Sequence, residues 1–200
     1  MSATPTTEGV YRVLESTRGA DERDGDEWLL LDVETGDPTY VPLADLDATA
    51  GNRVRATFVW LDSGPRVETS EVVEDTRFGF TRTREALFQD AHACWRDAEA
   101  AGEAMASRVT HGTDGDPNGV VYTFADQSGS RDLYEEFRDG GKPLEPLLAR
   151  LAESVDPPFE AFVLDHTGEP FVVVLLAFER DGLLARTVRE TYFGERSILP

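Results

Sequence analysis

Residues 171–178, Phe-Val-Val-Val-Leu-Leu-Ala-Phe, form the longest apolar run in the chain. Eight residues are too few to cross a membrane, which takes roughly 18, so we expect no contact with the membrane interior. The consecutive valines favour a β-strand. Because side chains alternate between the two faces of a sheet, a strand that is apolar on both faces is predicted to lie at the centre of its sheet.

The sequence around this run predicts an α+β domain over residues 77–200. An amphipathic helix of about 22 residues begins at Thr83 as N-cap, and strands follow at 108–111 and 120–125. Two helices, a strand at 159–164, the run at 171–178 and a last helix capped by Asp181 complete the domain. This order predicts an antiparallel or mixed sheet.

The N-terminal part, residues 1–76, is predicted to form a separate small domain. Its apolar and alternating stretches indicate five strands, at Val10–Leu14, Trp28–Val33, Thr39–Leu43, Asn52–Leu61 and Arg66–Val73. Five short antiparallel strands in about 65 residues are typical of a small closed barrel. We therefore expect a β-barrel, either OB-like or SH3-like, in front of the α+β domain.

The charge of the chain predicts the solvent in which it works. There are 39 acidic and 19 basic residues, a formal net charge of −20, and Lys142 is the single lysine beside 18 arginines. Residues 1–78 and residues 79–200 each carry −10, so the charge is spread over the chain. Such a surface repels itself in dilute buffer, whereas the Debye length at about 1 M salt is only roughly 3 Å. We expect a halophilic protein.

The sequence gives no chemistry for an active site. Cys94, the single cysteine, lies on the apolar stripe of the predicted helix and excludes an internal disulfide framework. No nucleophile elbow, phosphate-binding loop or dinucleotide fingerprint occurs, so no catalytic residue and no cofactor is predicted. The first residues lack the pattern of a secretory signal, and we expect a cytoplasmic protein.

The string Asp114-Gly115-Asp116-Pro117-Asn118-Gly119 has the alternating oxygen ligands of a calcium loop. The twelfth position of such a loop, which needs a bidentate acid, is Ala125, and a strand-like stretch follows where a helix is needed. We therefore interpret the string as an acidic hairpin turn and predict no metal site.

One segment departs from the acidic background. Residues 76–84, Thr-Arg-Phe-Gly-Phe-Thr-Arg-Thr-Arg, carry three arginines and two aromatics without an acid. Arginine beside aromatic rings is the chemistry of phosphate contact and base stacking. Together with arginines of the predicted barrel, the segment gives a candidate partner- or nucleic-acid-binding surface: Arg77, Phe78, Phe80, Arg82, Arg84, Arg53, Arg55 and Arg66. The other interpretation is a connector whose aromatics fill a seam while its arginines pair with acids.

The order of these features resembles an uncharacterised family of haloarchaeal proteins, a domain of unknown function. The matching stretches are Val10–Leu14, residues 108–124 and Pro170–Val174. The resemblance implies a halophilic, cytoplasmic protein and assigns no role to any residue.

We expect a soluble, non-enzymatic binding or adaptor protein that contacts RNA, single-stranded DNA or a protein of the information-processing machinery. The alternative is an enzyme of unrecognised mechanism with its site between the two domains.

Overall fold

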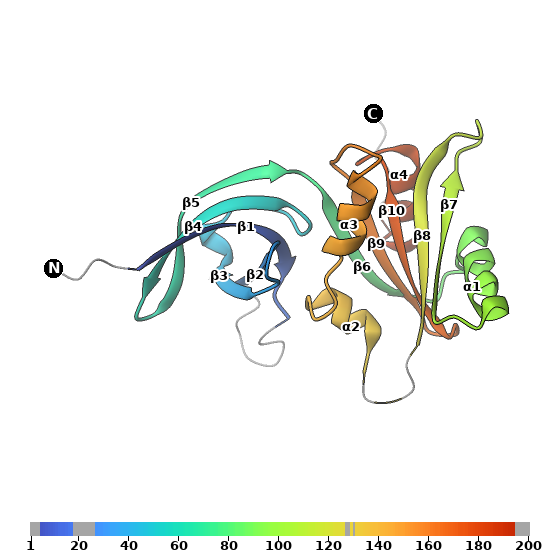
Figure 1. The fold of residues 1–200 in the computed structure, drawn as a ribbon, viewed down its shortest axis with the longest axis horizontal. Coiled ribbons are helices and arrows are strands. Elements are labelled where there is room, and N and C mark those ends of the chain that lie inside the picture. Colours follow the sequence, from blue (N-terminus) through green and yellow to red (C-terminus); the bar gives the residue numbers. More distant parts are fainter. Residues whose placement is uncertain (1–4, 18–26, 127–128, 130, 195–200) are drawn as a thin grey trace. The chain divides into compact units, whose positions relative to one another are not determined.

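The computed structural model describes residues 5–17, 27–126, 129 and 131–194. Within these residues, two five-stranded sheets and four α-helices form two compact units (Figure 1). The first unit contains residues 1–77 and 135–150, and the second contains residues 78–134 and 151–200.

The sheet of the first unit is antiparallel, with strand order β3-β2-β1-β4-β5. Its strands are β1 (Thr6–Glu15), β2 (Glu27–Asp32), β3 (Pro38–Pro42), β4 (Arg53–Leu61) and β5 (Gly64–Glu74), and a 3₁₀ turn, η1 (Leu43–Asp45), follows β3. The alternating strand β4 buries Val54, Ala56 and Phe58 in one core, as its pattern predicts.

The predicted N-terminal barrel is wrong, because the strands form an open sheet with β3 and β5 at its edges. Strand β2 buries three consecutive leucines, Leu29, Leu30 and Leu31, so both of its faces are covered. Residues 135–150 lie on the second face: the position of a Cβ on Gly140 is only 2.5 Å from Leu31 Cδ1. A strand buried on both faces fits an open sheet with cover on each side, as observed here.

The sheet of the second unit has strand order β6-β9-β10-β8-β7. Its strands are β6 (Arg77–Thr83), β7 (Met105–His111), β8 (Pro117–Ala125), β9 (Glu160–His166) and β10 (Phe171–Ala177). Strand β10 lies between β9 and β8, and all seven of its residues are buried, which confirms the predicted central strand. The sheet is mixed, one of the two alternatives that the sequence left open.

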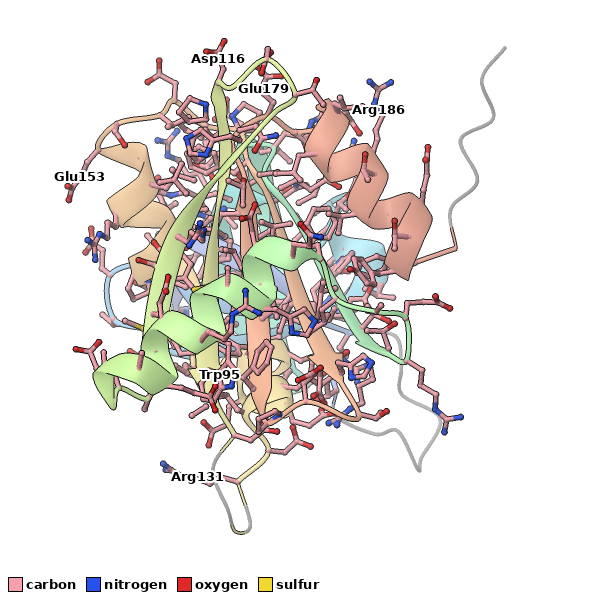
Figure 2. The ribbon with its side chains drawn as sticks, turned by 90° about the vertical axis from the view of Figure 1, so that its right-hand side faces the viewer. Trp95, Asp116, Arg131, Glu153, Glu179 and Arg186 are labelled. Carbon is pink, nitrogen blue, oxygen red and sulfur yellow. The ribbon has the colours of Figure 1, made fainter. Side chains whose placement is uncertain are left out.

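Two helices, α1 (Gln89–Ala101) and α4 (Leu183–Tyr192), pack on one face of this sheet, and Figure 2 shows α1 crossing its strands. Ala91 and Cys94 of α1 and Ala185 and Val188 of α4 share a core with the odd-numbered side chains of β10. The remaining helices are α2 (Leu133–Arg138) and α3 (Glu145–Ala152).

Two predicted helix starts are wrong. Thr83 ends β6, where its Oγ1 accepts a hydrogen bond from the Glu85 backbone N–H, and α1 begins six residues later at Gln89 after Phe88 as N-cap. Helix α1 ends at Gly102, whose φ of +68° suits glycine and stops the helix before Met105. Similarly, α4 begins after Gly182, and Asp181 does not cap it.

Candidate functional site

The predicted arginine-aromatic segment is an edge strand of the second sheet, not a loop. Phe78 and Phe80 are half-buried, and their rings meet edge-on with centroids 6.2 Å apart. Phe80 also meets the ring of Tyr134 at 6.5 Å. The two phenylalanine rings therefore pack within the protein, whereas a stacking platform for bases presents open ring faces.

Arg82 is held by two carboxylates of the same unit. Its Nη1 donates to Asp165 Oδ2 at 2.7 Å, its Nη2 donates to Asp132 Oδ2 at 2.5 Å, and its Cζ lies 4.6 Å from the centre of the Tyr134 ring. Burial raises the pKa of the nearby Asp126, and the charges of Asp165 and Asp132 raise it further against the effect of Arg82. A phosphate at Arg82 would have to displace two carboxylates.

The other predicted arginines are distributed over both units. Arg53, Arg55 and Arg66 lie on β4 and β5 of the first unit, Arg77 starts β6, and Arg84 is exposed directly after β6. Arg66 forms a bidentate pair with Asp45, and its hydrogen bonds lower the pKa of that carboxyl. Arg55 Nη1 lies 3.4 Å from Glu71 Oε2, and Arg53 Nη1 lies 3.9 Å from Glu74 Oε2. The surface that these residues were predicted to form stays a prediction.

A pocket of about 580 Å³ lies at one end of the second sheet. Three segments line it: the turn between β7 and β8, the residues after α3, and the turn from β10 into α4. The lining residues are Gly112, Thr113, Asp114, Asp116, Pro117, Asn118, Val155, Asp156, Phe178, Glu179, Gly182, Leu183 and Leu184. Its volume is within the range of roughly 300–1,000 Å³ that ligand pockets occupy.

The pocket has an acidic rim and a mixed lining, in which polar surface exceeds apolar surface. Asp114, Asp116, Asp156 and Glu179 are exposed, and none of the residues that line the pocket is basic. Figure 2 shows Asp116 and Glu179 close together at this end of the sheet. Of the apolar lining residues, Val155, Phe178 and Leu184 are half-buried and Leu183 is 68% exposed.

Residues 112–116 form the hairpin turn between β7 and β8, whereas Pro117, Asn118 and Gly119 of the predicted turn already belong to β8. The Gly112 N–H donates to the Asp116 carbonyl at 2.8 Å, and the Asp116 N–H donates to Asp114 Oδ1 at 3.1 Å. Gly115 has a φ of +86°, which glycine adopts without strain. The backbone therefore presents two aspartates at fixed positions on the rim.

An ionic network around the buried Glu160 holds the turn that starts α4. Glu160, 3% exposed, accepts a hydrogen bond from the Asp181 N–H at 3.1 Å and pairs with Arg189 of α4. Arg189 Nη2 also donates to Asp181 Oδ1 at 3.0 Å, so one arginine ties β9 to the turn. This network fixes the backbone beside Glu179 and Gly182, and it explains the positive φ of 60° at Asp181.

Cys94 is buried, as predicted, and its thiol points into the sheet. Thr123 Oγ1 donates to Cys94 Sγ at 3.4 Å. Burial raises the pKa of the Cys94 thiol, which disfavours the nucleophilic thiolate. His92 lies beside Glu169, with Nδ1 4.0 Å from Oε1. Over the described ranges, no group of three or more His, Cys, Asp or Glu side chains is placed to hold a metal ion.

Sequence reasoning missed Asp156 and Glu179. They stand 23 residues apart and about 40 to 60 residues beyond the hairpin, and no local pattern links three such distant segments. The local signals at this site, the Asp114–Gly119 string and the Asp181-Gly182 turn before an amphipathic helix, each mark a turn rather than a pocket.

The fold and the pocket define an α+β protein with two five-stranded sheets and an acid-rimmed cavity beside the second. The chain belongs to the family described as "Family of unknown function (DUF6663)", whose sequence profile matches residues 3–197. No curated protein matches the chain. In the part of the chain that the structure describes, no helix is both long and apolar enough to span a membrane.

Proposed function

We propose that this chain is a cytoplasmic, non-enzymatic binding protein, and that the acid-rimmed pocket of its second unit takes a basic segment of a partner protein. The observation that carries the proposal is a pocket lining that combines four carboxylates with apolar side chains and contains no basic residue. An arginine or lysine side chain has the same two parts, a charged head on an apolar stem. The stem packs on Phe178 and Leu184 while the head reaches the rim.

The apolar part of the lining matters because we also propose a haloarchaeal origin and a molar-salt environment. The charge of −20 and the near absence of lysine support this environment. At about 1 M salt, charges separated by more than roughly 3 Å are screened, so attraction at a distance contributes little. Binding then depends on direct contact between ion pairs and on buried apolar area, and the pocket offers surfaces for both.

A protein partner is favoured over nucleic acid by the state of the arginines. Arg66, Arg55 and Arg82 already have carboxylate partners within the chain. Phosphate binding releases counterions only where positive charge is uncompensated, and molar salt weakens it steeply. Four carboxylates of the second unit line the pocket, where they are available to pair with a cationic side chain.

The test is a binding titration with a labelled peptide, Arg-Leu-Arg-Leu, acetylated and amidated, in about 2 M KCl. We expect saturable binding to the wild type and weaker binding to the double variant Asp116→Asn/Glu179→Gln. Two exposed ion pairs contribute about 1 kcal/mol together, so the expected loss of affinity is roughly fivefold.

The matched control is Glu68→Gln/Glu71→Gln on β5, which removes the same charge from the first unit. We expect this variant to bind like the wild type. If both double variants lost the same affinity for the peptide, the binding would come from general attraction by an acidic surface, and the proposed pocket would be contradicted. A peptide Glu-Leu-Glu-Leu that binds as well as the basic peptide would contradict it too.

A further inference from the structure

The edges of the two sheets differ in how they are protected against pairing with another strand. Strand β3 has only five residues and a proline at each end. Strand β5 contains Pro65 and three glutamates, and its pairing with β4 has two register shifts. Strand β6 carries Arg77 and Arg82. Short length, proline, charge and bulges are the devices by which proteins block edge-to-edge association.

Strand β7, Met105–His111, has fewer of these devices: over its first six residues the one charged side chain is Arg108, which pairs with Asp90 and Asp97 of α1. It is regularly paired with β8 as far as Thr110, and it contains no proline. Residues 104–113 carry no acid, in a chain with 39 acidic residues. Met105 and Val109 are 44% and 46% exposed, whereas apolar side chains of this size are usually buried.

The backbone of β7 has a defined outward side. The Ala125 N–H donates to the Ala104 carbonyl at 2.8 Å, so residue 104 directs its polar backbone groups toward β8. These groups alternate in direction along an antiparallel strand. Residues 106, 108 and 110 therefore bond to β8, and the N–H and C=O groups of Met105, Ser107 and Val109 point away from the sheet.

From this geometry we infer that β7 is the interface of a symmetric dimer, in which β7 of a second copy pairs with it antiparallel, centred on Ser107. A two-fold axis at Ser107 places each Met105 opposite Val109 of the other copy and each Ser107 opposite itself. All three outward residues then meet outward residues, so three pairs exchange backbone hydrogen bonds in one register. The two sheets become one continuous sheet of ten strands.

The side chains fit the same register. Met105 and Val109 point to one face of the sheet, where the pairing brings an apolar side chain from each copy into contact. Arg108 points to the other face, where its guanidinium lies 3.4 Å from Asp90 and 3.3 Å from Asp97 of α1. The residue opposite Arg108 is Ala106 of the second copy, so no like charges face each other across the new strand pair.

The dimer is expected to depend on salt and concentration. Two copies of charge −20 repel each other in dilute buffer, and this repulsion is screened at about 1 M salt. The inference is independent of the proposed function, because no residue of 105–111 lines the acidic pocket.

The test is the molar mass of the full chain in about 2 M KCl, measured by light scattering after size exclusion at concentrations up to about 100 µM. We expect a dimer for the wild type and a monomer for Ser107→Pro. Proline at position 107 removes an outward N–H and leaves the bonds to β8 in place. Val109→Lys, which puts a charge on the apolar face, should also be monomeric, and it serves as the test if Ser107→Pro does not fold.

Val72→Lys on β5 is the control, since Val72 is 42% exposed and lies on the other sheet. This variant should remain a dimer. A monomeric wild type at every concentration would overturn the inference. So would a dimer that Val109→Lys leaves intact and Val72→Lys breaks, because that result would place the interface on β5.

Discussion

Arg12 joins several elements of the first unit, and its removal should destabilise that unit strongly. The residue is 4% exposed, and its guanidinium lies within one connected set of bonds. It donates to both carboxylate oxygens of Glu145 at 2.8 and 3.0 Å, to Glu74 at 3.0 Å and to the Gly51 carbonyl at 2.8 Å. These bonds join β1, the end of β5 and the start of α3.

The expected loss in the free energy of unfolding is set by the two carboxylates that Arg12→Met leaves without a partner. Burial alone lowers the pKa of Arg12, but the bonds and charges of Glu145 and Glu74 outweigh it, so the pKa is raised and the folded state favours the charged form. Methionine fills a similar volume and leaves two carboxylates without their cation. Breaking a buried pair costs about 3–5 kcal/mol. Because Glu74 and Glu145 are 13% and 21% exposed, water compensates in part, and we expect about 3 kcal/mol.

Urea unfolding in about 2 M KCl measures this change as a shift of the midpoint at constant slope. The matched control is Arg55→Met, which removes an exposed pair with Glu71 on the same sheet and should change stability by no more than about 1 kcal/mol. If Arg12→Met were no more destabilising than Arg55→Met, the claim that Arg12 holds residues 135–150 on the sheet would be refuted.

Three further predictions concern pH, packing and salt. Asp126→Asn should be more stable than the wild type at pH 7, because the raised pKa of Asp126 makes its charged form unfavourable in the folded state; the difference should vanish in melts below its unfolded pKa, roughly 3.9. Gly119→Ala should lower the free energy of unfolding, measured with urea, by about 1–3 kcal/mol, because a Cβ at this position lies 2.7 Å from Leu184 Cδ2 and 2.9 Å from the Leu176 carbonyl oxygen. The control is Gly168→Ala, where a Cβ meets only the His166 ring and the free energy of unfolding should change little. The thermal midpoint should be higher in about 2 M than in about 0.05 M KCl, and a midpoint independent of salt would contradict the halophilic proposal.

The centre of the second sheet could be predicted because its information is local. A run such as Phe171–Ala177, apolar on both faces, has one low-energy position, between two other strands with both faces covered. The same logic applied to Trp28–Asp32 would have excluded a small barrel, since its three consecutive leucines need cover on both faces. The segment that provides this cover begins more than 100 residues later, and no local pattern announces it.

Strand β6 was missed because its stability comes from distant partners. Its sequence, Arg-Phe-Gly-Phe-Thr-Arg-Thr, has a weak strand pattern. Gly79 leaves room for Phe193, whose ring atom Cζ lies 2.9 Å from the position of a Cβ, and β9 supplies the pairing. The arginines of this strand suggested a binding surface, and the carboxylates that Arg82 contacts, at positions 132 and 165, lie 50 and 83 residues away.

The central claim, that the acidic pocket binds a basic segment, is tested most directly by backbone amide chemical shifts of the ¹⁵N-labelled protein. Titration with the Arg-Leu-Arg-Leu peptide in about 2 M KCl should shift the amides of residues 112–118, 155–156 and 178–184 together, with one affinity. Shifts confined to residues 77–84, or spread evenly over acidic residues of both units, would contradict the claim.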